Sequence, residues 1–421
     1  MTKENNLQAT TAGEKPDRPV FLTSKSTANT SRVISLDLLR GIVMVIMALD
    51  HVRDFTHYGT FFNDPINLAT TNPALFFTRW ITHFCAPVFV FLAGTSAFLY
   101  GVRQGSTRAL SRFLLTRGLW LIFIELTVVN LGITFDIGFN LHIFQVIWAI
   151  GLSMICLAGL VYLPKNILLF VGLLIVAGHN LLDGIAMQGS SLPAILWYFL
   201  HQANFLPTGP ESAVFIVYPV LPWIGLMALG YVFGNLYRPG VEASVRKAFL
   251  WKAGLAAIGL FVLLRTFNLY GNPFPWGPQK DFVFSVLSFL NTNKYPPSLQ
   301  YLLMTIGPAL LFLYWAENRF KRTEGFFATI GRVPFFYYIL HFYVVHLVSV
   351  MFVWYAELPW SYNQLSARNM MQTPPDLLNY GYPLVVTYGA WFLVIAIMYP
   401  LCKWYDRYKR NNRDKWWLSY L

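Results

Sequence analysis

The sequence predicts an all-α membrane protein, a polytopic helix bundle of about ten transmembrane helices with both termini in the cytoplasm. Of its 421 residues, 56% are hydrophobic and only 12% are charged. This balance is typical of polytopic membrane proteins and too apolar for one soluble core. Apolar runs of about 20 residues, the length that crosses a bilayer, recur along the chain. Lysine and arginine alternate between the loops that join these runs, as the positive-inside rule requires.

The apolar runs divide the chain into three predicted parts. Residues 1–32 are polar and predict a disordered cytoplasmic tail, residues 33–404 form the membrane domain, and residues 405–421 form a basic, aromatic cytoplasmic tail. Two shorter apolar pieces, 192–206 and 282–290, are expected to lie at the interface or to re-enter the membrane, and either would be an eleventh span. The ten predicted spans lie near 33–55, 78–102, 109–131, 141–163, 166–187, 213–236, 248–269, 298–318, 329–355 and 382–404.

The basic residues set the orientation of the chain. The loop between the second and third spans holds Arg103, Arg108 and Arg112, whereas the next loop holds no Lys or Arg. The net charge of +12 therefore gathers at loop ends on one side of the membrane, which argues against a nucleic-acid-binding protein. The three cysteines are an odd number, and each lies in or beside an apolar run, so no disulfide framework is predicted.

The first predicted span carries an unusual number of ionisable residues. An ionisable group inside a membrane helix costs about 2.5–3.5 kcal/mol on insertion scales, so several of them need a reason. In a helix, residues 37, 40, 51 and 54 lie near one face, and Arg40 and His51 are about 16 Å apart along that face. The alternative is that charges at the helix ends reach the two interfaces, which suits Asp37 and Arg53 better than Arg40 and His51. The six residues are Asp37, Arg40, Asp50, His51, Arg53 and Asp54.

Further polar residues fall at the predicted outer side of other spans. Several at one depth predict a polar cavity that opens outward, although His341 and His346 are five residues apart and cannot both face it. His179 and Asp183, four residues apart, are the one pair with ligand spacing, and we therefore predict no metal site. The set comprises His83, Glu125, His142, His179, Asp183, Arg265, His341 and His346.

The polar residues favour proton-transfer chemistry. Histidine transfers protons near neutral pH, and Asp54, one turn after His51, would orient the ring and support its imidazolium. The sequence contains no P-loop, dinucleotide fingerprint, HExxH motif or serine elbow. A transferase, a proton-coupled secondary transporter and a non-catalytic membrane scaffold all remain compatible with these residues.

Long motifs along the chain resemble a known family. The stretches SLDLLRGIVMVIMALDHVRDF, APVFVFLAGTSAFLYG, FQVIWAIGLSMI, YPVLPWIGLMALGYVFG, YPPSLQYLLMTIGPALL and GRVPFFYYILHFYVVH resemble the bacterial heparan-alpha-glucosaminide N-acetyltransferase-like family of the transmembrane acyltransferase superfamily. The resemblance covers nearly all of residues 33–404. It implies an acyltransferase domain in the bacterial cytoplasmic (inner) membrane that moves an acetyl group from cytoplasmic acetyl-CoA to a sugar or glycan acceptor on the far side. The expected partners are the lipid bilayer and this acceptor, with no nucleic acid, and self-association is left open.

The resemblance also suggests roles for single residues. The interval between Arg40 and His51 looks like that of the arginine and active-site histidine in the O-acyltransferase branch of the superfamily. In the lysosomal N-acetyltransferase branch an asparagine takes the place of His51, and His57 is then the nearest match, so the base is either His51 or His57. The candidate catalytic residues are His51, Asp54, His57, His83 and His341. The candidates for the CoA phosphates are Arg40 and Arg332, with Arg112 and Arg117 behind them.

Overall fold

Helices make up most of the structure. The computed structural model describes residues 33–59, 62–319, 325–412 and 414–419, and the tail predicted over residues 1–32 lies outside them. The longer helices are α1 (Ile34–Thr56), α3 (Cys85–Gln104), α4 (Thr107–Ile124), α6 (Val146–Leu160), α7 (Lys165–Gly178), α9 (Leu221–Phe233), α10 (Ala243–Thr266), α12 (Leu299–Arg319), α14 (Pro334–Tyr355) and α17 (Leu384–Asn411). The short helices are α2 (Pro73–Trp80), α5 (Asn130–Thr134), α8 (Leu192–Leu200), α11 (Phe282–Leu290), α13 (Phe326–Arg332), α15 (Ala367–Met371) and α16 (Pro375–Asn379).

The helix lengths confirm an all-α membrane bundle. Seven helical stretches among the described residues are long and apolar enough to cross a membrane: Pro73–Gln104, Thr107–Thr134, Lys165–Leu182, Ala243–Thr266, Leu299–Glu317, Pro334–Tyr355 and Leu384–Asn411. Two more apolar helical stretches, Val146–Leu160 and Leu221–Tyr237, are shorter. Helix α1 has 23 residues, carries charged residues in both its N-terminal and its C-terminal half, and is not among these seven stretches. The count of ten spans and the cytoplasmic position of both termini stay predictions.

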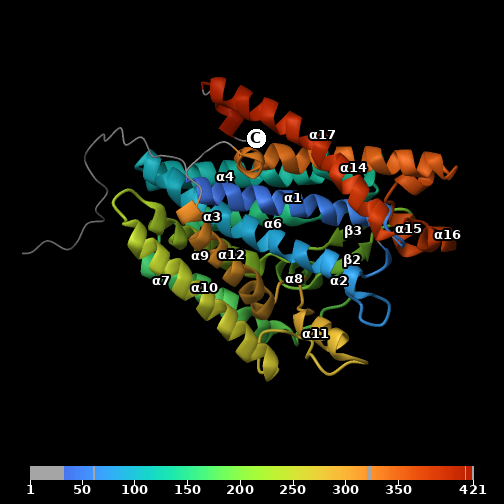
Figure 1. Ribbon diagram of the computed structural model, residues 1–421, viewed down its shortest axis with the longest axis horizontal. Coiled ribbons are helices and arrows are strands. Elements are labelled where there is room, and N and C mark those ends of the chain that lie inside the picture. Colours follow the sequence, from blue (N-terminus) through green and yellow to red (C-terminus); the bar gives the residue numbers. More distant parts are fainter. Residues whose placement is uncertain (1–32, 60–61, 320–324, 413, 420–421) are drawn as a thin grey trace, which may run out of the picture. The chain divides into compact units, whose positions relative to one another are not determined.

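Helix α1 lies among helices that come from both ends of the sequence. It packs against α3, α12, α13, α14 and α17, and most of its side chains are buried (Figure 1). Against α13 the two backbones nearly touch, since a Cβ atom added to Gly41 would lie 1.8 Å from the carbonyl oxygen of Phe327. A larger residue than glycine has no room there, so this contact fixes α1 against α13.

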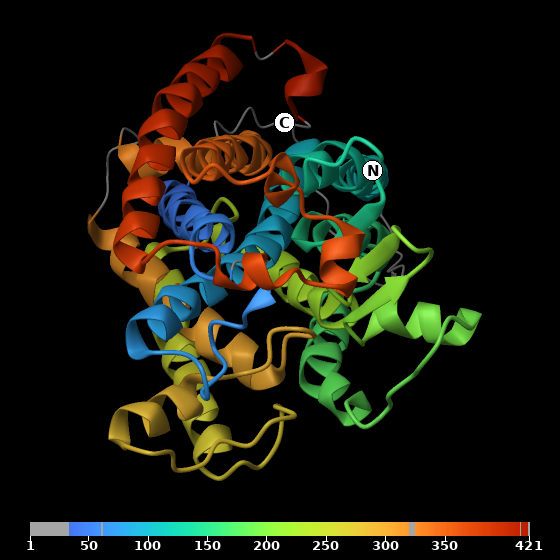
Figure 2. The same ribbon diagram turned by 90° about the vertical axis from the view of Figure 1, so that its right-hand side faces the viewer.

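A small sheet replaces the start of two predicted spans. Strands β1 (Leu141–Phe144), β2 (Asn204–Pro207) and β3 (Ala213–Ile216) form it in the order β1-β3-β2. β1 and β3 are parallel, with Leu141 opposite Ala213, and β2 is antiparallel to β3. The predictions that 141–163 and 213–236 are helical from their first residue were therefore wrong. The two segments satisfy each other's backbone groups by pairing instead, and the sheet lies beside α15 at one end of the bundle (Figure 2).

Proline breaks another predicted span. The segment 329–355 is divided at Val333, where α13 ends and α14 begins with Pro334. Proline has no backbone N–H and fits the first turn of a helix, so a new helix starts there. At the C-terminus the predicted boundary at residue 404 falls inside α17, which continues to Asn411.

The two shorter apolar pieces are surface helices. They form α8 and α11, of nine residues each. A helix of that length measures about 14 Å, less than half of the roughly 30 Å hydrocarbon core of a bilayer. Neither piece supplies an eleventh span.

Candidate functional site

The C-terminal half of α1 borders a polar cavity of about 350 Å³. Its wall combines three acidic and three basic side chains with one histidine, and apolar and aromatic residues fill the spaces between them. Such a mixture of hydrogen-bond acceptors and donors suits a polar ligand. The charged and titratable lining residues are Asp50, His51, Arg53, Asp54, Asp64, Arg79 and Lys294.

Ion pairs hold the acidic residues of this wall in place. Asp50 accepts from Arg79 of α2 and lies 3.0 Å from the guanidinium of Arg53. Arg53 also bonds to Asp54, so it links the two carboxylates. Asp50 and Arg53 are nearly inaccessible to solvent. Because an unpaired charge is very costly to bury, the two side chains can be buried only as partners in ion pairs.

His51 lies beside this network and faces the cavity. Its Nδ1 is 3.8 Å from Oδ2 of Asp54, the residue one turn further on. Its ring packs against Phe342 and His341 of α14, at centroid distances of 4.4 Å and 5.3 Å. The side chain of His51 is 18% exposed, so a molecule in the cavity reaches it while α14 fixes its orientation.

The N-terminal half of α1 borders a second cavity, of about 570 Å³. Mostly apolar side chains of α3, α4 and α6 line it, and Phe89 and Val146 belong to the walls of both cavities. Helix α1 thus forms a wall common to two adjacent cavities, with Arg40 on one and His51 on the other. The basic residues of the second cavity are Arg40, Arg103, Arg117 and Lys409.

The four predicted phosphate ligands divide into two groups. Arg40 and Arg117 lie on the wall of the larger cavity, as expected for a ligand-binding role. Arg40 also bonds to Asp37 at 2.9 Å and to the carbonyl oxygen of Gly331 at 3.1 Å, so part of its role is structural. Arg112 is exposed and lies outside the cavity lining. Arg332 lies outside it too and forms a two-pronged ion pair with the buried Asp406 of α17.

The other predicted histidines lie off the two cavity walls. His57 directly follows α1, and its Nδ1 is 2.9 Å from the carbonyl oxygen of Tyr382. Burial lowers the pKa of His57, and the contact with Tyr382 partly offsets this. His83 is buried against the ring of Tyr301. His341 is buried behind His51, with its Nδ1 2.5 Å from the carbonyl oxygen of Tyr338, so His341 can position His51 without touching a ligand.

Sequence reasoning missed several residues of the two walls. Arg79 and Lys294 come from the segments before α3 and α12. The one available signal was that a buried Asp50 needs a basic partner, and Arg79 is that partner. Arg103 was predicted only to set orientation, and Lys409 only to belong to the basic tail at 405–421, yet both line the larger cavity. Buried Glu125, on a π-helical turn that continues α4, accepts from the backbone N–H of Gln145 at 2.8 Å. It therefore supports the cavity wall from behind.

Comparison with known protein families gives a match over the N-terminal part of the chain. The model described as "Heparan-alpha-glucosaminide N-acetyltransferase, catalytic" matches residues 32–266, more than half of the chain. The match includes α1, α3, α4 and α6, and with them most of the wall of each cavity. Lys294 and Lys409 lie outside the matched residues. A comparison with curated proteins finds no match.

The ion-pair network leads to a prediction about stability. Asp50→Asn removes a charge between Arg53 and Arg79, and breaking a buried pair typically costs about 3–5 kcal/mol. We expect this variant to melt well below the wild type in a thermal scan of the detergent-purified protein. Glu211→Gln is the control, because Glu211 and Arg368 form an exposed pair at 3.6 Å, and such pairs contribute about 0–1 kcal/mol. Equal melting temperatures for the two variants would contradict the structural role of Asp50.

Proposed function

The chain belongs to the heparan-alpha-glucosaminide N-acetyltransferase catalytic family, and from this premise we propose that it transfers an acetyl group from acetyl-CoA to a sugar or glycan acceptor inside the membrane bundle. The family and the apolar helices support the general description, an integral membrane acetyltransferase. The donor, the side of the membrane that supplies it, the acceptor and the role of histidine are the specific content of the proposal.

The pair of adjacent cavities along α1 carries the proposal. Transfer between a donor and an acceptor that enter from opposite sides needs a binding space for each and a point where the two meet. Phe89 and Val146 border both cavities. Arg40 lies on the wall of the larger cavity, and His51 lies on the wall of the smaller one. Because Arg40 and His51 are about 16 Å apart along the helix, the acetyl group can reach His51 while the charged part of the donor stays near the membrane surface.

The larger cavity suits the donor. Its apolar interior fits an acetyl group and an uncharged chain, and its basic residues suit phosphate groups, which bind arginine through charge-assisted hydrogen bonds. Arg103 and Lys409 belong to segments that the loop charges predict to be cytoplasmic. We therefore propose that the phosphates of acetyl-CoA bind at Arg103, Arg117 and Lys409 and that the thioester extends toward Phe89.

The smaller cavity suits the acceptor. Its carboxylates and basic side chains offer partners to the hydroxyl and amino groups of a sugar. His51 takes the proton of the attacking group as the new bond to the acetyl carbon forms and the bond to sulfur breaks, and Asp54 stabilises the resulting imidazolium. A transient acetyl group on His51 is the other route that this geometry allows.

Turnover of acetyl-CoA by the purified protein tests the proposal. We expect release of CoA in detergent to depend on an acceptor when a panel of amino sugars and glycans is supplied. A proton-coupled transporter would use the same buried residues without consuming acetyl-CoA. Acetyl-CoA that is neither bound nor consumed with any acceptor would therefore favour the transporter.

His51 is the predicted base. General acid–base catalysis raises the rate of a reaction about 10²- to 10⁴-fold. His51→Ala should therefore lower kcat by a factor in this range or more, while the protein stays folded. His57→Ala is the matched control, because His57 lies six residues further along and off the cavity wall. We expect it to keep near wild-type turnover. An active His51→Ala variant beside an inactive His57→Ala variant would show that the base is His57.

Two arginines of α4 test the donor site. Arg117 lines the larger cavity, whereas Arg112 is exposed outside it. Arg117→Ala should raise the apparent KM for acetyl-CoA by roughly 10-fold, the equivalent of one charge-assisted hydrogen bond of about 1.5 kcal/mol, and should leave the KM for the acceptor unchanged. Arg112→Ala should leave both unchanged. A larger effect of Arg112→Ala on the donor KM would move the phosphate site out of this cavity.

A further inference from the structure

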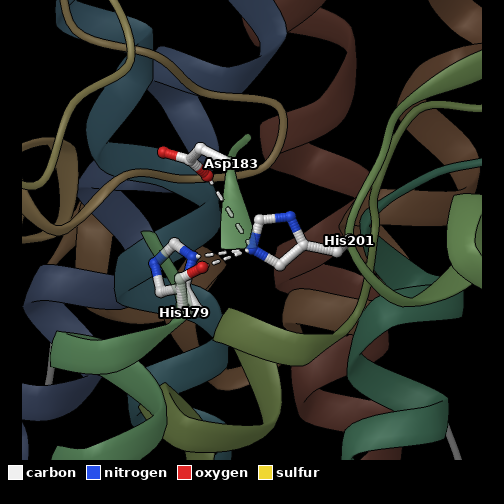
Figure 3. A group of neighbouring side chains, drawn as sticks. All are labelled: His179, Asp183 and His201. Carbon is white, nitrogen blue, oxygen red and sulfur yellow. Dashed lines mark hydrogen bonds and ion pairs between the residues drawn. The ribbon is translucent and has the colours of Figure 1, made fainter. Parts of the chain in front are cut away.

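Three potential metal ligands converge away from both cavities. His179 and Asp183 lie at the end of the helical stretch that begins with α7, and His201 directly follows α8 (Figure 3). Their ligand atoms lie within 4.8 Å of one another. The sequence predicted no metal site because only His179 and Asp183 have ligand spacing. His201 is 22 residues beyond His179, and the fold brings it to the pair.

The distances suit a tetrahedral ion. Zn²⁺ with bonds to nitrogen of about 2.0–2.1 Å holds two such ligands about 3.3–3.4 Å apart. Nδ1 of His179 and Nε2 of His201 are 3.4 Å apart. Oδ1 of Asp183 is 3.8 Å from the same nitrogen of His201, and the Asp183 side chain, 20% exposed, has room to approach.

The number of electron-pair donors also favours a cation. Nε2 of His201 lies 2.7 Å from the backbone carbonyl oxygen of His179, and in the absence of a metal one N–H group donates there. Nδ1 of His179 and Oδ1 of Asp183 face the same nitrogen. A metal ion takes the place of that hydrogen after His201 releases it, and it binds the three ligand atoms at once.

Neighbouring side chains orient two of the three ligands, Asp183 and His201. Asn180 donates to the second oxygen of Asp183 at 2.8 Å and accepts from the backbone N–H of Leu299 at 2.9 Å. The indole of Trp197 stacks on the ring of His201, with ring centroids 5.4 Å apart. Metal sites in proteins have such supporting contacts, which fix the direction of each ligand.

We propose that His179, Asp183 and His201 bind one divalent transition-metal ion, with Zn²⁺ as the ion that these ligands suit best. The ion joins the end of α7 to the end of α8. Strand β2 starts three residues after His201 and pairs with β3, which leads into Val217 and Tyr218 on the wall of the His51 cavity. The metal thus anchors a wall of that cavity and has a structural role, with no part in proton transfer.

Zinc content and thermal stability test the site together. The full chain, purified in detergent, is treated with EDTA, desalted and titrated with ZnCl₂ alone. We expect one zinc per chain by mass spectrometry of the metal and a melting temperature raised by several degrees. His201→Ala and Asp183→Asn should each weaken zinc binding by more than the roughly 10- to 100-fold that loss of an outer contact costs. Neither variant should gain stability from zinc.

Two controls separate the site from incidental binding. His142→Ala removes a histidine of β1 that lies outside the cluster and should keep both the zinc and the stabilisation. Asp183→Asn keeps the size of a partly exposed side chain, so it tests the site even if His201→Ala fails to fold. Equal zinc content in the wild type and both ligand variants, loss of zinc in His142→Ala, or a melting temperature that zinc does not change would each overturn the proposal.

Discussion

The structure depends on neutralising the charges that α1 carries into the interior of the helix bundle. Asp50 is buried and would be very costly there alone, and Arg53 and Arg79 offset its charge. Arg79 comes from α2, so the ion pairs dictate which segment must pack against the C-terminal half of α1. At the other end Arg40 pairs with Asp37 and bonds to α13. Because glycines let α1 and α13 approach so closely, this end of α1 is held by backbone contact as much as by charge.

The position of the charged residues on α1 also gives the two cavities their different character. A helix that keeps its polar residues near its two ends and apolar residues between them can form part of two cavities of different character. One is mostly apolar with basic residues, and the other is lined by paired charges and His51. The residues that border both, Phe89 and Val146, are apolar. In such a setting electrostatic contacts are stronger than in water, and Asp54 is the carboxylate that lies 3.8 Å from His51.

The sequence predicted the features that follow from composition and local period. The helical membrane bundle and the polar face of α1 needed only apolar run lengths and helix geometry. The small sheet was not predictable in this way, since β1 and β3 pair across about 70 residues and each adjoins an apolar helix. Arg79, Lys294 and Lys409 reach the cavities through tertiary packing, and single-sequence spacing carries no signal for that. His201 beside His179 is a further example, because the two meet only through the fold.

The proposed function depends on acetyl-CoA binding in the larger cavity. A cryo-electron microscopy structure with a non-hydrolysable acetyl-CoA analogue would show directly where the donor binds. We predict that the phosphates lie within hydrogen-bonding distance of Arg103, Arg117 or Lys409, and that the acetyl group lies between Phe89 and His51. We also predict that the cavity with Asp54 and Arg79 stays free for the acceptor. An analogue bound with its phosphates beside Arg79 and Lys294, or outside both cavities, would show that the larger cavity is not the donor site.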